Sequence, residues 1–124
     1  MILITCSGTI GKVALVPSHW EGWTANQHII RIIPSSENIT GVLFIFLASD
    51  YGKELIKRFT YGAVVDEIDD IHVSQIVFPL LKDEKQKHKI NQLVLDANQK
   101  RADAYYAEQK AIRIMNDEVI HVSL

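Results

Sequence analysis

The sequence predicts an α+β fold, in which a small mixed or antiparallel, β-rich unit is followed by a long C-terminal α-helix. Two observations support this prediction. Residues 1–81 contain short apolar, β-branched runs separated by glycine, proline and polar residues, which is typical of strands and turns. Residues 82–124 contain neither glycine nor proline and are rich in lysine, glutamate, glutamine and alanine, which favours a helix. We therefore expect two segments, a β-rich unit over 1–81 and a long helix over 82–124.

Composition limits the class of protein. The 124 residues are 48% hydrophobic and 23% charged, which suits one domain with a real core. The net charge of −2 does not indicate a nucleic-acid binder, although local charge decides such binding. The single cysteine, Cys6, excludes a disulfide within the chain and a cysteine-based zinc cluster, and it fits a reducing, cytoplasmic setting.

The N-terminal residues give no sign of membrane targeting. No stretch is apolar for long enough to cross a bilayer, and the start lacks the basic region of a signal peptide. The chain opens directly into an apolar run, as expected of a piece of a longer domain or of an edge strand at a true N-terminus.

A glycine turn follows the first apolar run. Residues 2–4 and 13–16 are predicted strands, and the turn between them contains Gly8 and Gly11. The surrounding polar residues are Thr5, Ser7, Thr9 and Lys12. The spacing excludes a phosphate-binding P-loop and a dinucleotide fingerprint. The turn suits a phosphate or a base edge, but an ordinary hairpin turn remains the alternative.

Residues 17–28 form a predicted loop before the strand at 29–33, which Pro34 ends. Its two tryptophans, Trp20 and Trp23, either cap the end of a sheet core or form a stacking surface for a partner. Asn26, Gln27 and His28 directly precede the strand. Asparagine and glutamine can pair bidentately with adenine, although both are also common in loops.

The middle of the chain is less clearly patterned. We expect a polar loop over 35–40 and an apolar segment over 41–49 that is either a strand or a buried helix. A helix is predicted over 52–59, with Leu55, Ile56 and Phe59 on one face. Its polar face carries a small basic patch, which by default is a solvated surface. The patch consists of Lys53, Lys57 and Arg58.

Two further strands are predicted, over 60–65 and over 72–80, the second ended by Pro79. Four carboxylates lie between them, at Asp66, Glu67, Asp69 and Asp70. Their spacing is not that of a calcium loop, because the glycine and the terminal glutamate are missing. We therefore expect a solvated turn or a helix cap and not a metal site.

The segment from residue 82 to about 119 is predicted to be one long amphipathic helix, or two in line. The apolar stripe consists of Ile90, Leu93, Val94, Ala97, Tyr105, Ile112, Met115 and Val119, with Ala102 off the pattern. Some thirty helical residues would span about 45 Å, more than a small domain needs. We therefore expect the stripe to pack on another helix, from a second chain or a partner segment.

The start of this helix is basic, and placed beside the glycine turn it would attract phosphates. The cluster consists of Lys82, Lys85, Lys87, His88 and Lys89, set against Asp83 and Glu84. No catalytic constellation is apparent, because the five histidines share no metal-ligand spacing and Ser7 lies in no nucleophile motif. We expect no enzymatic activity, no cofactor and no metal.

The ordered series of segments resembles the specificity subunit of type I restriction-modification systems. The segments are SGTIGKVALVP, ANQHIIRIIP, GVLFIFLASDYG, YGAVVDEI, SQIVFPL and EKQKHKINQLVLDANQKRADAYYAEQKAI. Together with the tryptophan loop they cover nearly the whole chain. The resemblance is to the distal half of a target recognition domain and the long helix behind it. It implies a partial target recognition domain over 1–81 and a spacer or dimerisation helix over 82–124.

The resemblance implies a non-catalytic module that recognises double-stranded DNA. In that family the methyltransferase (modification) subunit binds S-adenosylmethionine and docks on the long helices, and restriction subunits join through the complex. The alternative is a fragment that forms homodimers or other protein contacts through its helix and does not bind DNA by itself.

Residue-level hypotheses follow from side-chain chemistry. The candidate DNA-binding residues are Ser7, Thr9, Lys12, Asn26, Gln27 and His28, with Lys57, Arg58 and Tyr61 as weaker backbone contacts. The candidate protein-interface residues are Ile90, Val94, Ala97, Tyr105 and Ile112.

Overall fold

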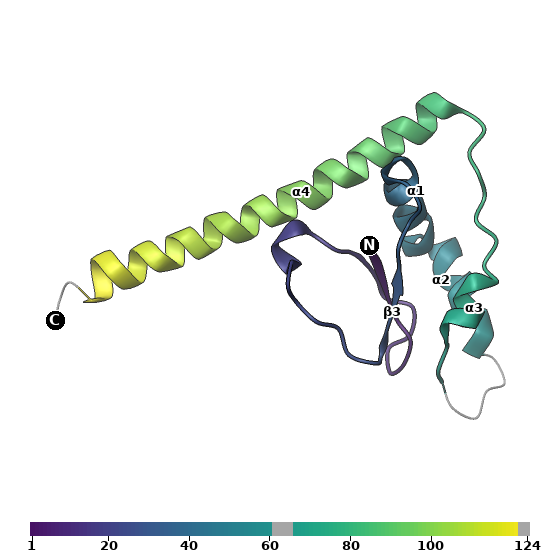
Figure 1. The fold of residues 1–124 in the computed structure, drawn as a ribbon, viewed down its shortest axis with the longest axis horizontal. Helices are drawn as coiled ribbons and strands as arrows, with labels where there is room; N and C mark the ends of the chain where they lie inside the picture. Colours follow the sequence, from purple (N-terminus) through teal and green to yellow (C-terminus); the bar gives the residue numbers. More distant parts are fainter. Residues whose placement is uncertain (61–65, 122–124) are drawn as a thin grey trace.

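The computed structural model describes residues 1–60 and 66–121, and it confirms the predicted α+β fold. The strands are β1 (Ile2–Thr5), β2 (Val13–Leu15) and β3 (Ile29–Ile32), and the helices are α1 (Glu37–Ala48), α2 (Asp50–Lys57), α3 (Asp70–Ser74) and α4 (Glu84–Ile114). Two 3-10 segments, η1 (Ser18–Trp20) and η2 (Arg58–Thr60), and a π-helical segment, η3 (Met115–Ile120), complete the description. Figure 1 shows α4 lying across the small body that the other elements form.

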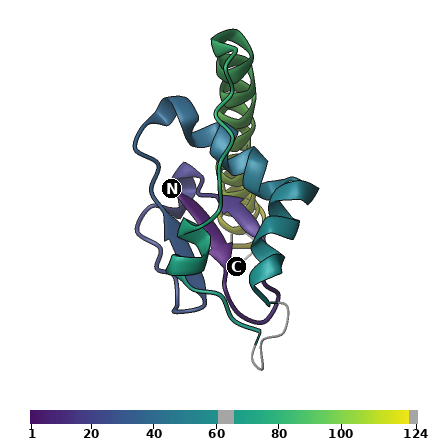
Figure 2. The same ribbon diagram turned by 90° about the vertical axis from the view of Figure 1, so that its right-hand side faces the viewer.

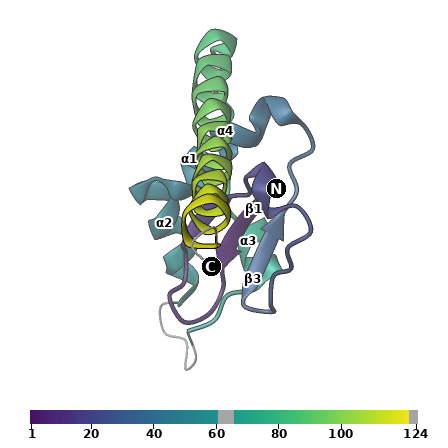
Figure 3. The ribbon, with the colours of Figure 1, turned by 90° about the vertical axis from the view of Figure 1, so that its left-hand side faces the viewer.

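The three strands form an antiparallel sheet of order β2-β1-β3. Ile2 of the central strand faces Leu15 on one side and Ile32 on the other. Because side chains alternate along a strand, Ile2 and Ile4 share one face, and both are fully buried. Figures 2 and 3 show α1 and α2 together on one side of the sheet and the loop between β2 and β3 on the other.

The core joins the buried sheet face to three helices. Its members are Ile2, Ile4, Cys6, Leu15, Leu47, Ile56, Ile68 and Val94. Leu47 comes from α1, Ile56 from α2 and Val94 from α4, so residues from both halves of the chain meet in one cluster. Burial of these aliphatic side chains is the main favourable contribution to the stability of such a small body.

A buried amide joins α1 to α4. Asn91 accepts a hydrogen bond from the Gly41 backbone N–H at 2.7 Å and donates one to the Glu37 carbonyl at 3.0 Å. Those two backbone groups are four residues apart, the spacing that pairs within a regular α-helix. The Asn91 side chain therefore satisfies a donor and an acceptor of the α1 backbone. A Cβ atom at Gly41 would lie 2.7 Å from the Asn91 carbonyl oxygen, so only glycine permits this approach.

The predicted long helix is confirmed and is continuous over 31 residues, or about 46 Å. Its N-terminal part packs on α1, and the buried residues of the helix are Asn91, Val94 and Ala102. Ala102 is fully buried, although the periodicity analysis placed it off the apolar stripe. The residues from 107 to 121 are all exposed, and Figure 1 shows this part projecting beyond the body.

The predicted strand over 72–80 is wrong. Its first residues belong to α3, and the residues that follow form no strand. The Asp69 side chain accepts a hydrogen bond from the His72 N–H at 2.9 Å, and the Asp69 N–H donates to the His72 ring at 3.1 Å. This reciprocal cap fixes a helix start. The expected helix cap is thereby confirmed at Asp69, whereas the apolar run at 76–78 forms no strand.

The predicted polar loop over 35–40 is also wrong in its second half, because α1 begins at Glu37. Ser36 caps this helix by accepting a hydrogen bond from the Asn38 N–H at 3.1 Å. The open choice over 41–49 is settled as helix, and the helix over 52–59 is confirmed as α2, which Ser49 caps. Thr60 ends η2, and the rest of the predicted strand over 60–65 lies outside the described residues.

We expect Asn91→Ala to lower the free energy of unfolding by about 1–3 kcal/mol, because it leaves a buried space and two backbone groups without their partner. Gln92→Ala is the matched control, since Gln92 is exposed and bonds only Asp96 on the helix surface. It should change stability by less than about 0.5 kcal/mol. Urea denaturation followed by circular dichroism measures both. Equal midpoints for the two variants would show that this amide does not hold the helices together.

Candidate nucleic-acid interface

The loop between β1 and β2 is a turn closed by Thr5. The Thr5 carbonyl accepts from the Gly11 N–H, and its N–H donates to the Lys12 carbonyl, both at 3.0 Å. The Thr5 hydroxyl also accepts from the Lys12 N–H at 3.0 Å. Gly8 and Gly11 have φ of 68° and 85°, which explains the two glycines that the sequence places there. The loop exposes Thr9 and the Lys12 side chain.

The turn before β3 lies directly beside this loop. The Asn26 side chain accepts a hydrogen bond from the His28 N–H at 3.0 Å, which fixes the turn. The His28 carbonyl accepts from the Cys6 N–H at 2.9 Å, which extends the pairing of β1 with β3. The Ser7 hydroxyl and the His28 ring are 2.5 Å apart. The structure thus brings six predicted residues together at one end of the sheet, although they come from two segments. They are Ser7, Thr9, Lys12, Asn26, Gln27 and His28.

The members of this group differ in what they can still bind. Ser7 and His28 bond each other, and the Asn26 carbonyl oxygen is used within its own turn. Within residues 1–60 and 66–121, the Lys12 and Gln27 side chains make no hydrogen bond or ion pair. Lys12 on the β2 side of β1 carries an ammonium, and Gln27 on the β3 side an amide, and these are the groups that bind a phosphate and a base edge.

The tryptophan loop lies between this end of the sheet and α4. Trp20 and Trp23 stack with ring centroids 5.7 Å apart and planes at 11°. His19 stacks on Tyr105 of α4 with centroids 4.3 Å apart. Trp23 is 62% exposed, and neither tryptophan belongs to the buried core. The predicted role of capping the end of the sheet core therefore does not fit these two tryptophans. The alternative role, a stacking surface for a partner, stays a prediction.

One protein family matches this chain over most of its length. The family model of the type I restriction modification DNA specificity domain matches residues 1–94. The chain belongs to this family. The match covers the sheet, the glycine loop, the turn before β3 and the first part of α4, and it confirms the family that the sequence resembles. Neither the curated proteins nor the solved structures give a match.

The predicted basic patch of Lys53, Lys57 and Arg58 has most of its positive charge paired with other groups of the chain. Lys57 lies 3.8 Å from the Glu54 carboxylate, and Lys53 lies 3.7 Å from that of Asp50. The Arg58 guanidinium lies 4.7 Å from the centre of the Phe59 ring and donates a hydrogen bond of 3.5 Å to the Gln75 carbonyl. Tyr61, the third weaker candidate, lies outside the described residues. The role of these residues toward DNA stays a prediction.

The lysines at the start of α4 do not lie beside the glycine loop. Figure 1 shows the start of α4 at the upper right and the loop between β1 and β2 at the lower side of the body. Lys87 also pairs with Glu84 at 2.6 Å. The expected joint electrostatic footprint with the loop is therefore wrong, because α1 holds the beginning of α4 far from it.

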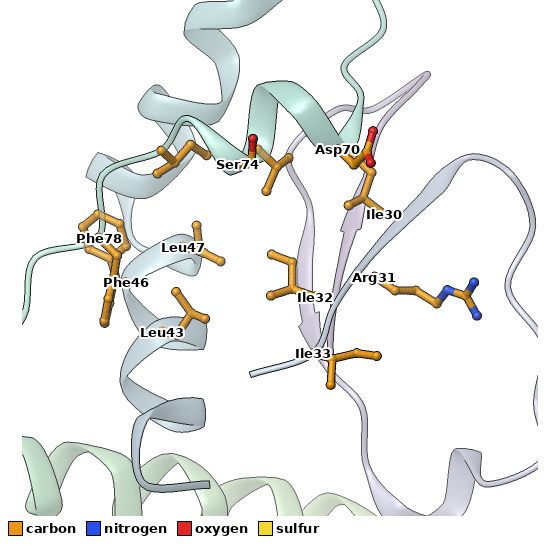
Figure 4. Close-up of a pocket in the computed structure, with 12 residues that line it drawn as sticks. Ile30, Arg31, Ile32, Ile33, Leu43, Phe46, Leu47, Asp70, Ser74 and Phe78 are labelled. Carbon is orange, nitrogen blue, oxygen red and sulfur yellow. The ribbon is translucent and has the colours of Figure 1, made fainter. Parts of the chain in front are cut away.

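An apolar cavity of about 370 Å³ separates β3 from α1 and α3. Figure 4 shows Ile32 pointing toward Leu47 of α1, whereas Arg31 points to the other side of β3. The cavity continues the core and gathers no polar group of the loop and turn described above. Its lining residues include Ile30, Ile32, Leu43, Phe46, Val73 and Phe78.

Over residues 1–60 and 66–121, no three histidine, cysteine, aspartate or glutamate side chains gather as a metal site would require. In the same ranges, no helix combines the length and apolarity needed to cross a bilayer.

Sequence reasoning missed Arg31, which strand alternation places on the face opposite Ile30 and Ile32. That alternation was the available signal.

Proposed function

We propose that this chain is a non-catalytic, sequence-specific DNA-recognition subunit of a type I restriction-modification system, or a fragment of one. It would direct methyltransferase and restriction subunits to a target site in cytoplasmic DNA. The family match supports this role, and one observation carries the residue assignment. The glycine loop and the turn before β3 meet at one end of the sheet, where Lys12 and Gln27 are free to bind.

The Lys12 ammonium and the Gln27 amide would have different roles in DNA recognition. The Lys12 ammonium would bind a phosphate, which supplies affinity that does not depend on sequence. The Gln27 amide would pair with a base edge, where its adjacent donor and acceptor match adenine. The Ser7–His28 contact holds the loop and the turn in register, so the spacing between the phosphate and base contacts is fixed before DNA binds.

The proposal also names protein partners. A non-catalytic recognition subunit would depend on bound subunits for methylation and cleavage. A tagged full-length chain should therefore retain a DNA adenine methyltransferase subunit from its native lysate, with restriction subunits joining through that complex. Retention of no such subunit would contradict the proposed place in a modification complex.

We expect Lys12→Ala to weaken binding to all duplexes and to reduce the slope of log K against log salt by about one. Lys100→Ala is the control, because it removes the same charge from an exposed position on α4. Fluorescence anisotropy of a labelled duplex at several salt concentrations measures the slope. If the two variants match the unmodified chain, Lys12 does not contact phosphate.

Gln27→Ala should relax the preference at one base pair by roughly 1–3 kcal/mol and leave the salt slope unchanged. Selection of bound duplexes from a random pool, followed by sequencing, measures the preference in the complex with the methyltransferase subunit. Gln109→Ala, on the exposed part of α4, should return the unmodified motif. An unchanged motif with Gln27→Ala would remove Gln27 from base recognition.

A second candidate function is protein contact through α4 without DNA binding. Asn91, Val94 and Asn98 face the body, and the same alternation of three and four residues continues to Ile112 and Met115. Those two side chains are 48% and 52% exposed. Among the predicted interface residues, Val94 is buried within the chain and Tyr105 stacks on His19. Ile90 is half-buried and Ala97 is exposed, so a partner would rest mainly on Ile112.

If the chain forms a homodimer through α4, Ile112→Asp should shift it toward monomer, because a buried carboxylate without a partner is costly. Ala107→Asp is the matched control, since Ala107 is exposed and lies about 140° around the helix from Ile112. Sedimentation velocity over a range of concentrations measures the distribution. A monomeric unmodified chain, or equal effects of the two variants, would contradict this second function.

A further inference from the structure

The outer face of the sheet combines apolar side chains with Thr5, Lys12 and Arg31. Antiparallel sheets with one solvated face usually carry polar side chains there. In this chain the side chains that share the outer face include Leu3, Ala14 and Ile29, and Arg31 lies opposite Leu3 across the strand pair. The helices cover the other face (Figures 2 and 3). An apolar sheet face that helices leave uncovered is a docking surface.

The tryptophan loop turns this face into a groove of about 850 Å³. Trp20 and Trp23 form one wall, and Asn26 and Lys12 lie at the end that adjoins the glycine loop. The remaining lining residues are mostly aliphatic. They are Met1, Leu3, Thr5, Val13, Ala14, Val16, Thr24, Ala25, Ile29 and Arg31.

The charge of the groove has one sign. Among the described residues, Lys12 and Arg31 are the charged side chains that line it, and no carboxylate does. Neither cation has an ion pair within residues 1–60 and 66–121. Figure 4 shows Arg31 extending away from α1, toward the groove side of β3. Two uncompensated positive charges therefore flank aromatic and apolar surface, although the chain as a whole carries a charge of −2.

We propose that this groove binds an unpaired stretch of one DNA strand, with a base stacked on Trp23 and the adjoining phosphates on Lys12 and Arg31. Indole rings beside cations are the groups that hold unpaired strands in other single-strand binding surfaces. A paired duplex presents phosphates and base edges, whereas stacking on an indole requires an exposed base face. This inference rests on the proposed DNA-recognition function and adds a site for a locally opened duplex.

The position of the groove favours a nucleic acid over a polypeptide. Lys12 and Asn26 belong both to the groove and to the loop-and-turn end of the sheet that would contact the duplex. A strand held there would continue into the groove without leaving the surface. An acidic, apolar peptide would satisfy the charges too, but nothing connects such a peptide to the loop and the turn.

The chain offers a direct reporter, because both of its tryptophans line the groove. Tryptophan emission of the full chain is followed while three probes are added at low salt. These are a 12-nucleotide oligothymidylate, a blunt 20-base-pair duplex and the same duplex with a four-nucleotide single-stranded gap. We expect oligothymidylate and the gapped duplex to quench the emission to saturation and to shield it from iodide. The blunt duplex should bind, by anisotropy, with much less quenching.

Two variants assign the effect to the groove. Trp23→Ala should weaken oligothymidylate binding roughly ten- to a hundredfold, with Trp20 remaining as the reporter. Leu93→Ala, which removes an apolar side chain that is 61% exposed on α4, should leave it unchanged. Arg31→Ala should reduce the salt slope for oligothymidylate by about 0.7, whereas Arg113→Ala on the exposed part of α4 should not. Circular dichroism verifies that each variant is folded.

Three outcomes would overturn the inference. If the blunt duplex binds but no probe quenches or shields the tryptophans, the groove does not bind DNA. The proposed DNA-recognition function would still stand in that case. If a peptide of alternating glutamate and leucine quenches the emission and oligothymidylate does not, the groove binds polypeptide. If no probe binds at all, the DNA-recognition function fails together with the groove.

Discussion

The Asn91 amide, buried between two helices, is the contact on which the arrangement of this molecule depends. It bonds an N–H and a carbonyl of the α1 backbone at the one place where glycine lets α4 approach. Because α1 also covers the sheet through Leu47, this contact fixes the direction of α4 relative to the strands. A buried polar group of this kind specifies one geometry, since any other packing would leave it without partners.

The position of α4 in turn decides what surrounds the tryptophan loop. Asn98 donates a hydrogen bond of 3.1 Å to the Val16 carbonyl, directly before the loop, and Tyr105 stacks on His19 within it. The start of the loop, as far as η1, is thus held by α4. The wall of the outer groove therefore depends on helix packing, although most of the groove floor comes from strands.

The sequence predicts the strands and the long helix well because their signals are local. Isoleucines 29, 30 and 32 bounded by Pro34 indicate a strand wherever they lie, and a segment of 31 residues without glycine or proline favours a helix. The failures arise where a short polar contact outweighs composition. The Asp69 cap turns an apolar run into α3, and the Ser36 cap starts α1 inside a polar segment. The meeting of Ser7 with His28 follows from strand pairing, which no single segment specifies.

The order of the sheet has a consequence for solubility. Among the described residues β3 pairs only with β1, so its outer edge can recruit another extended chain. The window 29–33 is four isoleucines and one arginine, a composition prone to intermolecular β-pairing, and Ile33 is 80% exposed. Arg31 and Pro34 are the two residues that oppose such pairing, one by repulsion and one by lacking an N–H. The positive charge of Arg31 in the middle of this aliphatic strand therefore disfavours edge-to-edge association of copies of the chain.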